Sequence, residues 1–219
     1  MSDRPSKNPD SRHSNEFLQQ AYALHDLQQA RQFYERWARD YDTEMEGQLR
    51  YVAPRLLAEI LSEHAPGDAT AEVLDVGCGT GLTSHYLREL GYALFDGIDI
   101  TKEMLDRARE RGIYRALHEA DITKPIALKD AQYDVVVSSG TFTLGHVDSQ
   151  PLPELLRVLK PNGYLACTVH KDLWEAQGFR GQFEQFADDG VLVEREFRRG
   201  EFFEGLGETA LYCIYQKPG

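Results

Sequence analysis

The chain has 219 residues, with 24 Lys and Arg against 36 Asp and Glu, and a formal net charge of −12. Its basic residues are interleaved with acidic ones, so it shows no basic stripe of the kind that binds nucleic acid. No apolar run approaches the length of a membrane span, and the polar start of the sequence lacks the apolar core of a signal peptide. We therefore expect a cytoplasmic protein.

The N-terminal part divides into a polar lead and a helical segment. Residues 1–14 are rich in Pro and Ser and are expected to be disordered, whereas 15–219 form one domain with N-terminal helices over 15–63. Apolar spacing predicts helices at 16–30, 31–41 and 51–63. Tyr34, Trp37 and Tyr41 recur on one face of the second helix. This stripe is consistent either with packing on the core or with a lid over a ligand.

The most informative stretch is an apolar strand followed by glycines at alternate positions. Residues 72–76 run into Gly77, Gly79 and Gly81, and a helix is expected over 82–90. Such a loop presents backbone N–H groups to a ligand. A dinucleotide fingerprint would need a third glycine where Leu82 stands, and Asp75 would repel a pyrophosphate. Asp75 suits a ligand that carries an ammonium group, although a nicotinamide-dependent dehydrogenase stays an alternative.

Strands and helices alternate from residue 72 onward, as in a wound parallel sheet. Further strands are expected at 93–100, 117–123, 133–140, 164–169, 191–197 and 209–216, the last two forming an antiparallel edge. Helices are expected at 152–159 and within 170–190, where an aromatic face would pack on the sheet. Asp99 ends the second strand, where an acid can accept hydrogen bonds from both hydroxyls of a ribose. Thr101 would cap the helix that follows.

Five landmarks occur in the order that they have in one enzyme class. They are the 75–81 loop, Asp99, Asp121, the central strand at 133–140 and the turn at 159–163. The sequence thus resembles the class I S-adenosylmethionine-dependent methyltransferases. The segment from Tyr34 to Asp42 and the run Gly145-His146-Val147 are most similar to the small Williams-Beuren-region methyltransferase-like branch.

The resemblance implies a fold, a cofactor and its contacts. The expected fold is α/β and Rossmann-like over 72–219, with a seven-stranded, mostly parallel sheet, an antiparallel last strand, helices on both faces and an N-terminal helical lid. The expected cofactor is S-adenosyl-L-methionine and the product S-adenosyl-L-homocysteine. Asp99 would bind the ribose, Asp121 and the Ile122 N–H the adenine edge, and Ile100 and Met104 its faces. The full expected cofactor set is Tyr34, Tyr41, Asp75, Gly77, Cys78, Gly79, Gly81, Asp99, Ile100, Met104, Asp121, Ile122 and Ser139.

Methyl transfer needs alignment of nucleophile and methyl carbon, and a general base only if the acceptor arrives protonated. His146 and His170 follow strands and are candidate bases, each with a structural hydrogen bond as the alternative. Trp37, Phe142 and His146 are expected at the substrate mouth. Because no large domain is inserted, we expect a small, partly aromatic acceptor. A non-catalytic S-adenosylmethionine-binding regulatory protein is the alternative, and the oligomeric state stays open.

The three cysteines, Cys78, Cys167 and Cys213, are widely spaced in apolar or glycine-rich stretches. Their spacing fits neither a zinc site nor a disulfide framework. The sequence therefore predicts reduced thiols and no bound metal.

Overall fold

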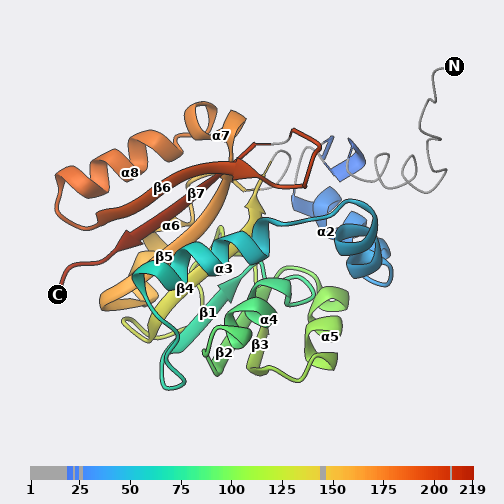
Figure 1. The fold of residues 1–219 in the computed structure, drawn as a ribbon, viewed down its shortest axis with the longest axis horizontal. Helices are drawn as coiled ribbons and strands as arrows, with labels where there is room; N and C mark the ends of the chain where they lie inside the picture. Colours follow the sequence, from blue (N-terminus) through green and yellow to red (C-terminus); the bar gives the residue numbers. More distant parts are fainter. Residues whose placement is uncertain (1–18, 22, 25–26, 144–146, 208) are drawn as a thin grey trace, which may run out of the picture.

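Seven strands form one sheet with helices on both faces in the computed structural model, which describes residues 19–219 except 22, 25–26, 144–146 and 208 (Figure 1). The strand order is β3-β2-β1-β4-β5-β7-β6, and β7 is antiparallel to both of its neighbours. The mostly parallel sheet that the sequence predicted is confirmed, although β7 lies inside the sheet and β6 forms the edge. The strands are β1 Glu72–Val76, β2 Leu94–Asp99, β3 Tyr114–Glu119, β4 Tyr133–Phe142, β5 Leu159–His170, β6 Val193–Glu201 and β7 Thr209–Gln216.

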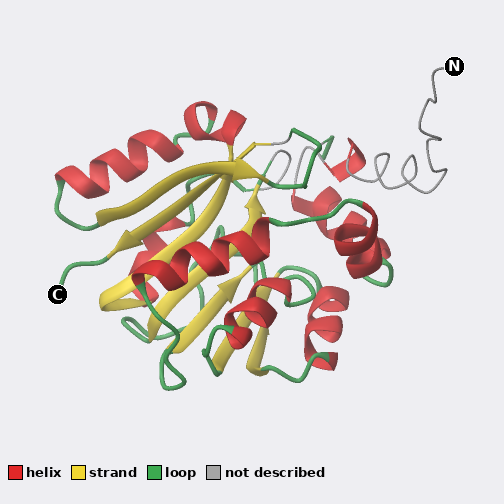
Figure 2. Ribbon diagram, viewed as in Figure 1, coloured by secondary structure: helices red, strands yellow, loops and turns green. Residues whose placement is uncertain are grey.

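Helices cover the sheet because alternate strand residues point to opposite faces (Figure 2). Val73, Val135 and Val137 belong to one buried cluster, and Leu74 and Val136 belong to the other. The first cluster takes apolar residues from α3 and α4, and the second takes them from α6, α7 and α8. The helices are α2 Leu27–Trp37, η1 Thr43–Gln48, α3 Ala53–His64, α4 Leu82–Glu89, α5 Lys102–Glu110, α6 Leu152–Val158, α7 Lys171–Ala176 and α8 Phe179–Asp188.

Several element boundaries differ from the sequence prediction. The third strand ends at Glu119, so Asp121 lies in the turn beyond the strand. Helix α2 runs through the expected boundary at 30–31, and a short π-helix, η1, follows it. The single helix expected within 170–190 is broken into α7 and α8, because Gly178 takes a left-handed conformation (φ 76°). Strand β6 extends to Glu201, through residues expected in a connection.

The aromatic face of the 170–190 segment packs on the sheet, as predicted. The rings of Phe183 and Tyr215 stack at a centroid distance of 4.4 Å, and those of Trp174 and Phe197 lie 5.0 Å apart.

Pairing between β5 and β7 places Cys167 opposite Cys213, with both thiols buried. Burial raises the pKa of the Cys213 thiol. None of the helices in the described parts of the chain is long and apolar enough to cross a membrane.

The N-terminal helices lie beyond the carboxyl ends of the parallel strands (Figure 1). Phe33 and Trp37 on α2 are each only 3% exposed and join the buried cluster that α3 and α4 share. The aromatic stripe is therefore partly core. The expected helix at 16–30 falls largely on residues outside the described ranges, and the expected disordered lead at 1–14 lies wholly outside them.

Candidate active site

The glycine loop after β1 needs glycine for two different reasons. Gly77, Gly79 and Gly81 have φ values of 65°, 52° and 94°, a region that residues with a side chain rarely adopt. A Cβ at Gly77 would lie 2.1 Å from the Thr141 hydroxyl, so this glycine lets the end of β1 approach β4. A Cβ at Gly79 would meet no atom within 4 Å. Gly79 therefore faces open space, and Gly81 begins α4 as its N-cap.

A cavity opens at the carboxyl ends of β1, β2, β3 and β4, and it has an empty volume of about 750 Å³ that includes space open to the solvent. We call it the first cavity. Ten of the thirteen expected cofactor residues line it: Tyr34, Tyr41, Gly77, Gly79, Asp99, Ile100, Met104, Asp121, Ile122 and Ser139. Six more lining residues were not in the expected cofactor set: Ala30, Thr101, Ala120, Gly140, Thr141 and Val147.

A local signal exists for two of these six residues. Ala30 precedes Tyr34 by one helical turn, and side chains at this spacing share a helix face. Thr141 follows the small residues that end the expected fourth strand. The three expected residues that do not line the cavity are Asp75, Cys78 and Gly81.

Asp99 joins the glycine loop to the start of α5. Its Oδ2 accepts the Gly79 N–H at 2.9 Å and its Oδ1 accepts the Thr101 N–H at 2.8 Å. Burial raises the pKa of the Asp99 carboxyl. Thr101 holds the N-cap position but makes no side-chain cap, and its buried Oγ1 has no hydrogen-bond partner among the described residues. Thr101 is therefore the N-cap of α5 by position, as expected, but its side chain does not cap the helix.

Asp121 is held by its own turn. Its Oδ1 accepts hydrogen bonds from the Thr123 N–H at 3.0 Å and from the Thr123 hydroxyl, and its Oδ2 lies 3.0 Å from the Lys124 ammonium. Burial acts to raise the pKa of Asp121, but the hydrogen bonds from Thr123 and Lys124 outweigh it and the pKa is lowered. The side chain is thus an ionised acceptor at the cavity wall.

Asp75 lies beneath the loop rather than in the cavity. Its Oδ2 accepts the Ser84 hydroxyl at 2.7 Å and the Tyr114 hydroxyl at 2.8 Å, and the residue is 1% exposed. Its buried Oδ1 has no hydrogen-bond partner in the described part of the chain. Cys78 is also buried, and its N–H bonds the Ile98 carbonyl. The direct contact between Asp75 and a ligand ammonium group that the sequence suggested is not seen in this geometry.

Burial of Asp75 predicts a pH dependence of stability. Loss of solvation raises its pKa from 3.8 to about 6, against hydrogen bonds from Ser84 and Tyr114 that lower it. The folded state then holds this proton more tightly than the unfolded chain. The protonated carboxyl thus adds roughly 3 kcal/mol at most to the free energy of unfolding. This contribution is complete below about pH 4 and is lost as the pH rises through about 6. Urea unfolding of the wild type and of Asp75→Asn across this range should give profiles that diverge with pH, and parallel profiles would contradict the assignment.

The N-terminal helices close over the loop through Asp42. The Asp42 carboxylate accepts hydrogen bonds from the Thr80 hydroxyl and from the Arg111 guanidinium. Arg111 also donates from Nε to the Thr80 carbonyl at 2.6 Å. On the same segment, Tyr34 and Tyr41 line the first cavity, and burial raises the pKa of Tyr41 well above its usual value.

Asp42→Ala should loosen this closure. With both acceptors lost, we expect faster hydrogen exchange at the Ala38, Glu44 and Leu49 amides, whose carbonyl partners lie within the same segment. The affinity for S-adenosylhomocysteine should fall by no more than roughly tenfold, because the ion pair between Asp42 and Arg111 is partly exposed. Asp40→Ala changes an exposed acid two residues away and is the control. Equal exchange in both variants would show that Asp42 does not hold the segment.

A second cavity, of about 370 Å³ and also open to the solvent, adjoins the first and shares Tyr34, Tyr41 and Gly140 with it. Its other lining residues are Ala21, Trp37, Met45, Tyr51, Thr143, Phe202 and Phe203. The indole Nε1–H of Trp37 donates to the buried Glu44 carboxylate at 3.0 Å, which leaves the ring beside the cavity. Phe142, expected at the mouth, is instead fully buried 5.1 Å from the Phe179 ring and lines neither cavity.

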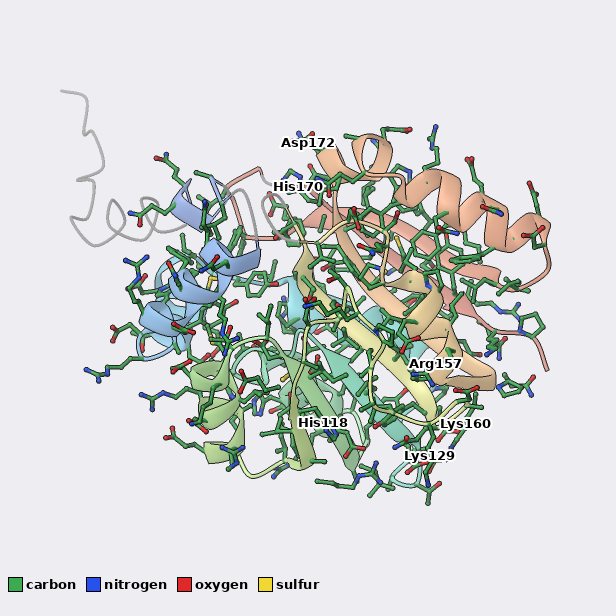
Figure 3. The ribbon with its side chains drawn as sticks, turned by 180° about the vertical axis from the view of Figure 1, so that it is seen from behind. His118, Lys129, Arg157, Lys160, His170 and Asp172 are labelled. Carbon is green, nitrogen blue, oxygen red and sulfur yellow. The ribbon has the colours of Figure 1, made fainter. Side chains whose placement is uncertain are left out.

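Of the two candidate bases, only His170 lies within the described residues. Figure 3 shows His170 and Asp172 together at one end of the sheet. His170 is 2% exposed, its Nδ1 accepts the Asp172 N–H at 3.2 Å at the start of α7, and its ring stacks on Phe202. It lines neither cavity, although Phe202, on which it stacks, lines the second one. His146 lies outside the described residues.

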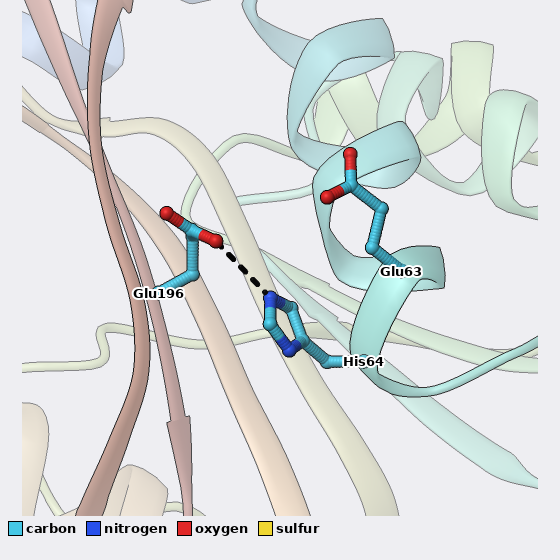
Figure 4. Close-up of side chains that lie close together, drawn as sticks. All are labelled: Glu63, His64 and Glu196. Atoms are coloured by element: carbon cyan, nitrogen blue, oxygen red, sulfur yellow. Dashed lines mark ion pairs between the residues drawn. The ribbon is translucent and has the colours of Figure 1, made fainter.

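A separate group of Glu63, His64 and Glu196 has three possible metal-ligand atoms within 4.8 Å of one another (Figure 4). The His64 Nε2 lies 3.4 Å from a Glu196 oxygen. The Arg198 guanidinium pairs with Glu63 at 3.0 Å and with Glu196 at 3.1 Å, and so supplies the positive charge there. The group is thus an ion-pair network between α3 and β6.

A family model and several known proteins match this chain in sequence. Residues 74–167 match a family model described as a methyltransferase domain. Methyltransferase-like protein 27 of Homo sapiens is 36% identical over 151 residues, which cover 68% of this chain and 61% of that protein. The malonyl-[acyl-carrier protein] O-methyltransferase of Pseudescherichia vulneris is 32% identical over 168 residues, which cover 73% of this chain and 63% of that protein. The chain therefore spans about three fifths of the length of these relatives.

A solved structure supports the same fold. A chain from the complex of the Haloferax volcanii Trm112 methyltransferase activator with a methyltransferase has a TM-score of 0.64 and 20% identity, over 85% of this chain and 98% of that one. The likeness to the human protein fits the predicted Williams-Beuren-region branch. Family and fold together imply S-adenosylmethionine as the cofactor. Residues 74–167 therefore match a methyltransferase domain, and the chain has the fold of the class I S-adenosylmethionine-dependent methyltransferases.

Proposed function

We propose that this chain binds S-adenosylmethionine in the first cavity and transfers its methyl group to a small-molecule acceptor. The observation that supports the proposal is the lining of one cavity by the glycine loop, Asp99 and Asp121. These groups follow three different strands, and ligands of open α/β sheets bind beyond strand carboxyl ends.

The residues present fit the cofactor. The open space at Gly79 leaves room beside the loop backbone, where a methionine moiety can lie. Each Asp99 oxygen accepts one backbone hydrogen bond, and a carboxylate has about four acceptor positions, so some are left for ribose hydroxyls. Asp121 and the Ile122 N–H are assigned to the adenine edge, and Ile100 and Met104 to its faces. When bound, the cofactor would supply an activated methyl group, and the chain's part is to orient it and exclude water.

The second cavity supports a small acceptor. It lies directly beside the first one and is bounded by the N-terminal helices and by Phe202 and Phe203. In the described residues, only α7 and α8 lie between β5 and β6, and a turn around Phe203 lies between β6 and β7, so no large domain is inserted there. At the far end of the sheet, Arg157 and Lys160 (Figure 3) pair with acids such as Glu154 and Asp134. These cations are thus already neutralised by the protein's own carboxylates.

Calorimetry with S-adenosylhomocysteine and with NADH, in parallel, tests the proposal. We expect saturable binding of the first and none of the second. Binding of NADH alone would favour a dehydrogenase. Binding of S-adenosylhomocysteine without any loss of S-adenosylmethionine across a panel of small phenols, thiols and amines would favour the non-catalytic alternative, a regulatory binder.

A further inference from the structure

The second cavity is built from segments far apart in the sequence. Tyr51 pairs with Phe203 in an isolated antiparallel bridge, and their rings lie 5.2 Å apart. The next backbone N–H, of Val52, donates to the Phe202 carbonyl at 2.9 Å. Tyr34, Trp37 and Tyr41 of the N-terminal helical segment also line the cavity. Aromatic side chains thus bound it from two directions.

The Tyr51 hydroxyl marks the boundary between the two cavities. It lies 3.5 Å from the Ser139 hydroxyl, and a Cβ at Gly140 would come within 2.4 Å of it. Ser139 lines the first cavity, Tyr51 the second, and Gly140 both. A group carried in the first cavity can therefore meet a molecule in the second one beside this hydroxyl.

The charges around both cavities disfavour an anionic acceptor. Among the described lining residues, the second cavity has no charged side chain and the first has only two acids, Asp99 and Asp121. The whole chain carries a net charge of −12. A carboxylate or phosphate placed here would meet no partner of opposite sign from the described lining, and its desolvation would go uncompensated.

Among the described lining residues there is also no proton acceptor suited to neutral pH. No Asp, Glu or His of the described chain lines the second cavity. Burial raises the pKa of Tyr51 to about 12, so its hydroxyl stays protonated and acts as a donor. An acceptor that must lose a proton before reaction, such as a phenol, therefore finds no base among the described lining residues.

We infer that the second cavity is the acceptor site and that its acceptor is a small, planar, uncharged aromatic molecule whose nucleophile is a ring nitrogen. This rests on the proposed methyl transfer. The nitrogen lone pair forms the bond to the methyl carbon while the carbon–sulfur bond breaks and its electron pair stays on sulfur. The positive charge passes from sulfonium to the product ring, and no proton moves. Aromatic faces attract such a cation, and the Tyr51 hydroxyl lies where the nucleophile must enter.

Three probes of similar size test the inference: isoquinoline, isoquinoline-5-carboxylate and the saturated amine quinuclidine. Saturation-transfer NMR in the presence of S-adenosylhomocysteine measures binding, and incubation with S-adenosylmethionine measures methylation. Isoquinoline should bind at least about tenfold more tightly than its carboxylate, which carries a negative charge. Of isoquinoline and quinuclidine, only isoquinoline should be methylated, because quinuclidine is protonated at neutral pH and has no free lone pair. Tighter binding of the carboxylate, or methylation of quinuclidine in preference to isoquinoline, would overturn the inference.

Two variants locate the binding. Phe203→Leu removes an aromatic face and should weaken isoquinoline binding, whereas Phe197→Leu, a ring packed on Trp174 away from the cavity, should not. Tyr51→Phe should slow methylation. Tyr92→Phe removes a hydroxyl that donates to the Ala65 carbonyl and should not slow it.

Each variant must bind S-adenosylhomocysteine like the wild type, which also shows that it folds. If S-adenosylhomocysteine binds but isoquinoline does not, this inference fails and the proposed function stands. If S-adenosylhomocysteine does not bind the wild type, the proposed function fails first.

Discussion

Gly79→Val is expected to abolish S-adenosylhomocysteine binding while leaving the protein folded. A Cβ at Gly79 meets no protein atom within 4 Å, so the branched side chain would extend into the first cavity. There it would occupy the space proposed for the methionine moiety. Calorimetry should show an affinity at least about a hundredfold lower, since a steric overlap cannot be relieved by a rigid loop. Circular dichroism should show unchanged secondary structure.

The strain of the substitution needs its own control, because Gly79 has a positive φ of 52°. Gly112→Val supplies it. Gly112 has a φ of 66°, a Cβ there would also meet nothing within 4 Å, and it lies after α5 without lining either cavity. This variant should share the backbone strain and keep normal binding. If both variants bind like the wild type, the loop is not the cofactor site; if both lose binding, strain alone explains the loss.

Local signals made the first cavity predictable from the sequence. Glycines at alternate positions fix the loop, and an acid at a strand's end is placed by that strand, so both depend on short stretches of chain. Phe142 shows where this fails. The fourth strand was expected to end at Gly140 but runs two residues further. Phe142 joins the buried cluster that contains Val136 and packs in the core instead of lying at the mouth.

Long-range pairing explains what the sequence did not show. Asp75 is held by Ser84 and Tyr114, and no local pattern connects it with a tyrosine on β3. Tyr51 and Phe203 meet only because their segments form a bridge. The second cavity therefore could not be derived from spacing along the chain, although the aromatic residues that line it are visible in the sequence.

Asp99→Ala should weaken S-adenosylhomocysteine binding by about 1–3 kcal/mol, because buried hydroxyls would lose a charged acceptor. The carboxylate, however, also holds the Gly79 and Thr101 N–H groups, so a loss of affinity alone does not prove ribose contact. Methylthioadenosine and its 2′-deoxy analogue separate the two roles. In the wild type the deoxy analogue should bind more weakly, and in Asp99→Ala the two should bind nearly alike. Asp106→Ala, at a half-buried acid on α5 that lines neither cavity, is the control and should behave like the wild type. An unchanged ratio between the two nucleosides in Asp99→Ala would mean that Asp99 only supports the loop and the start of α5, and that another group binds the ribose.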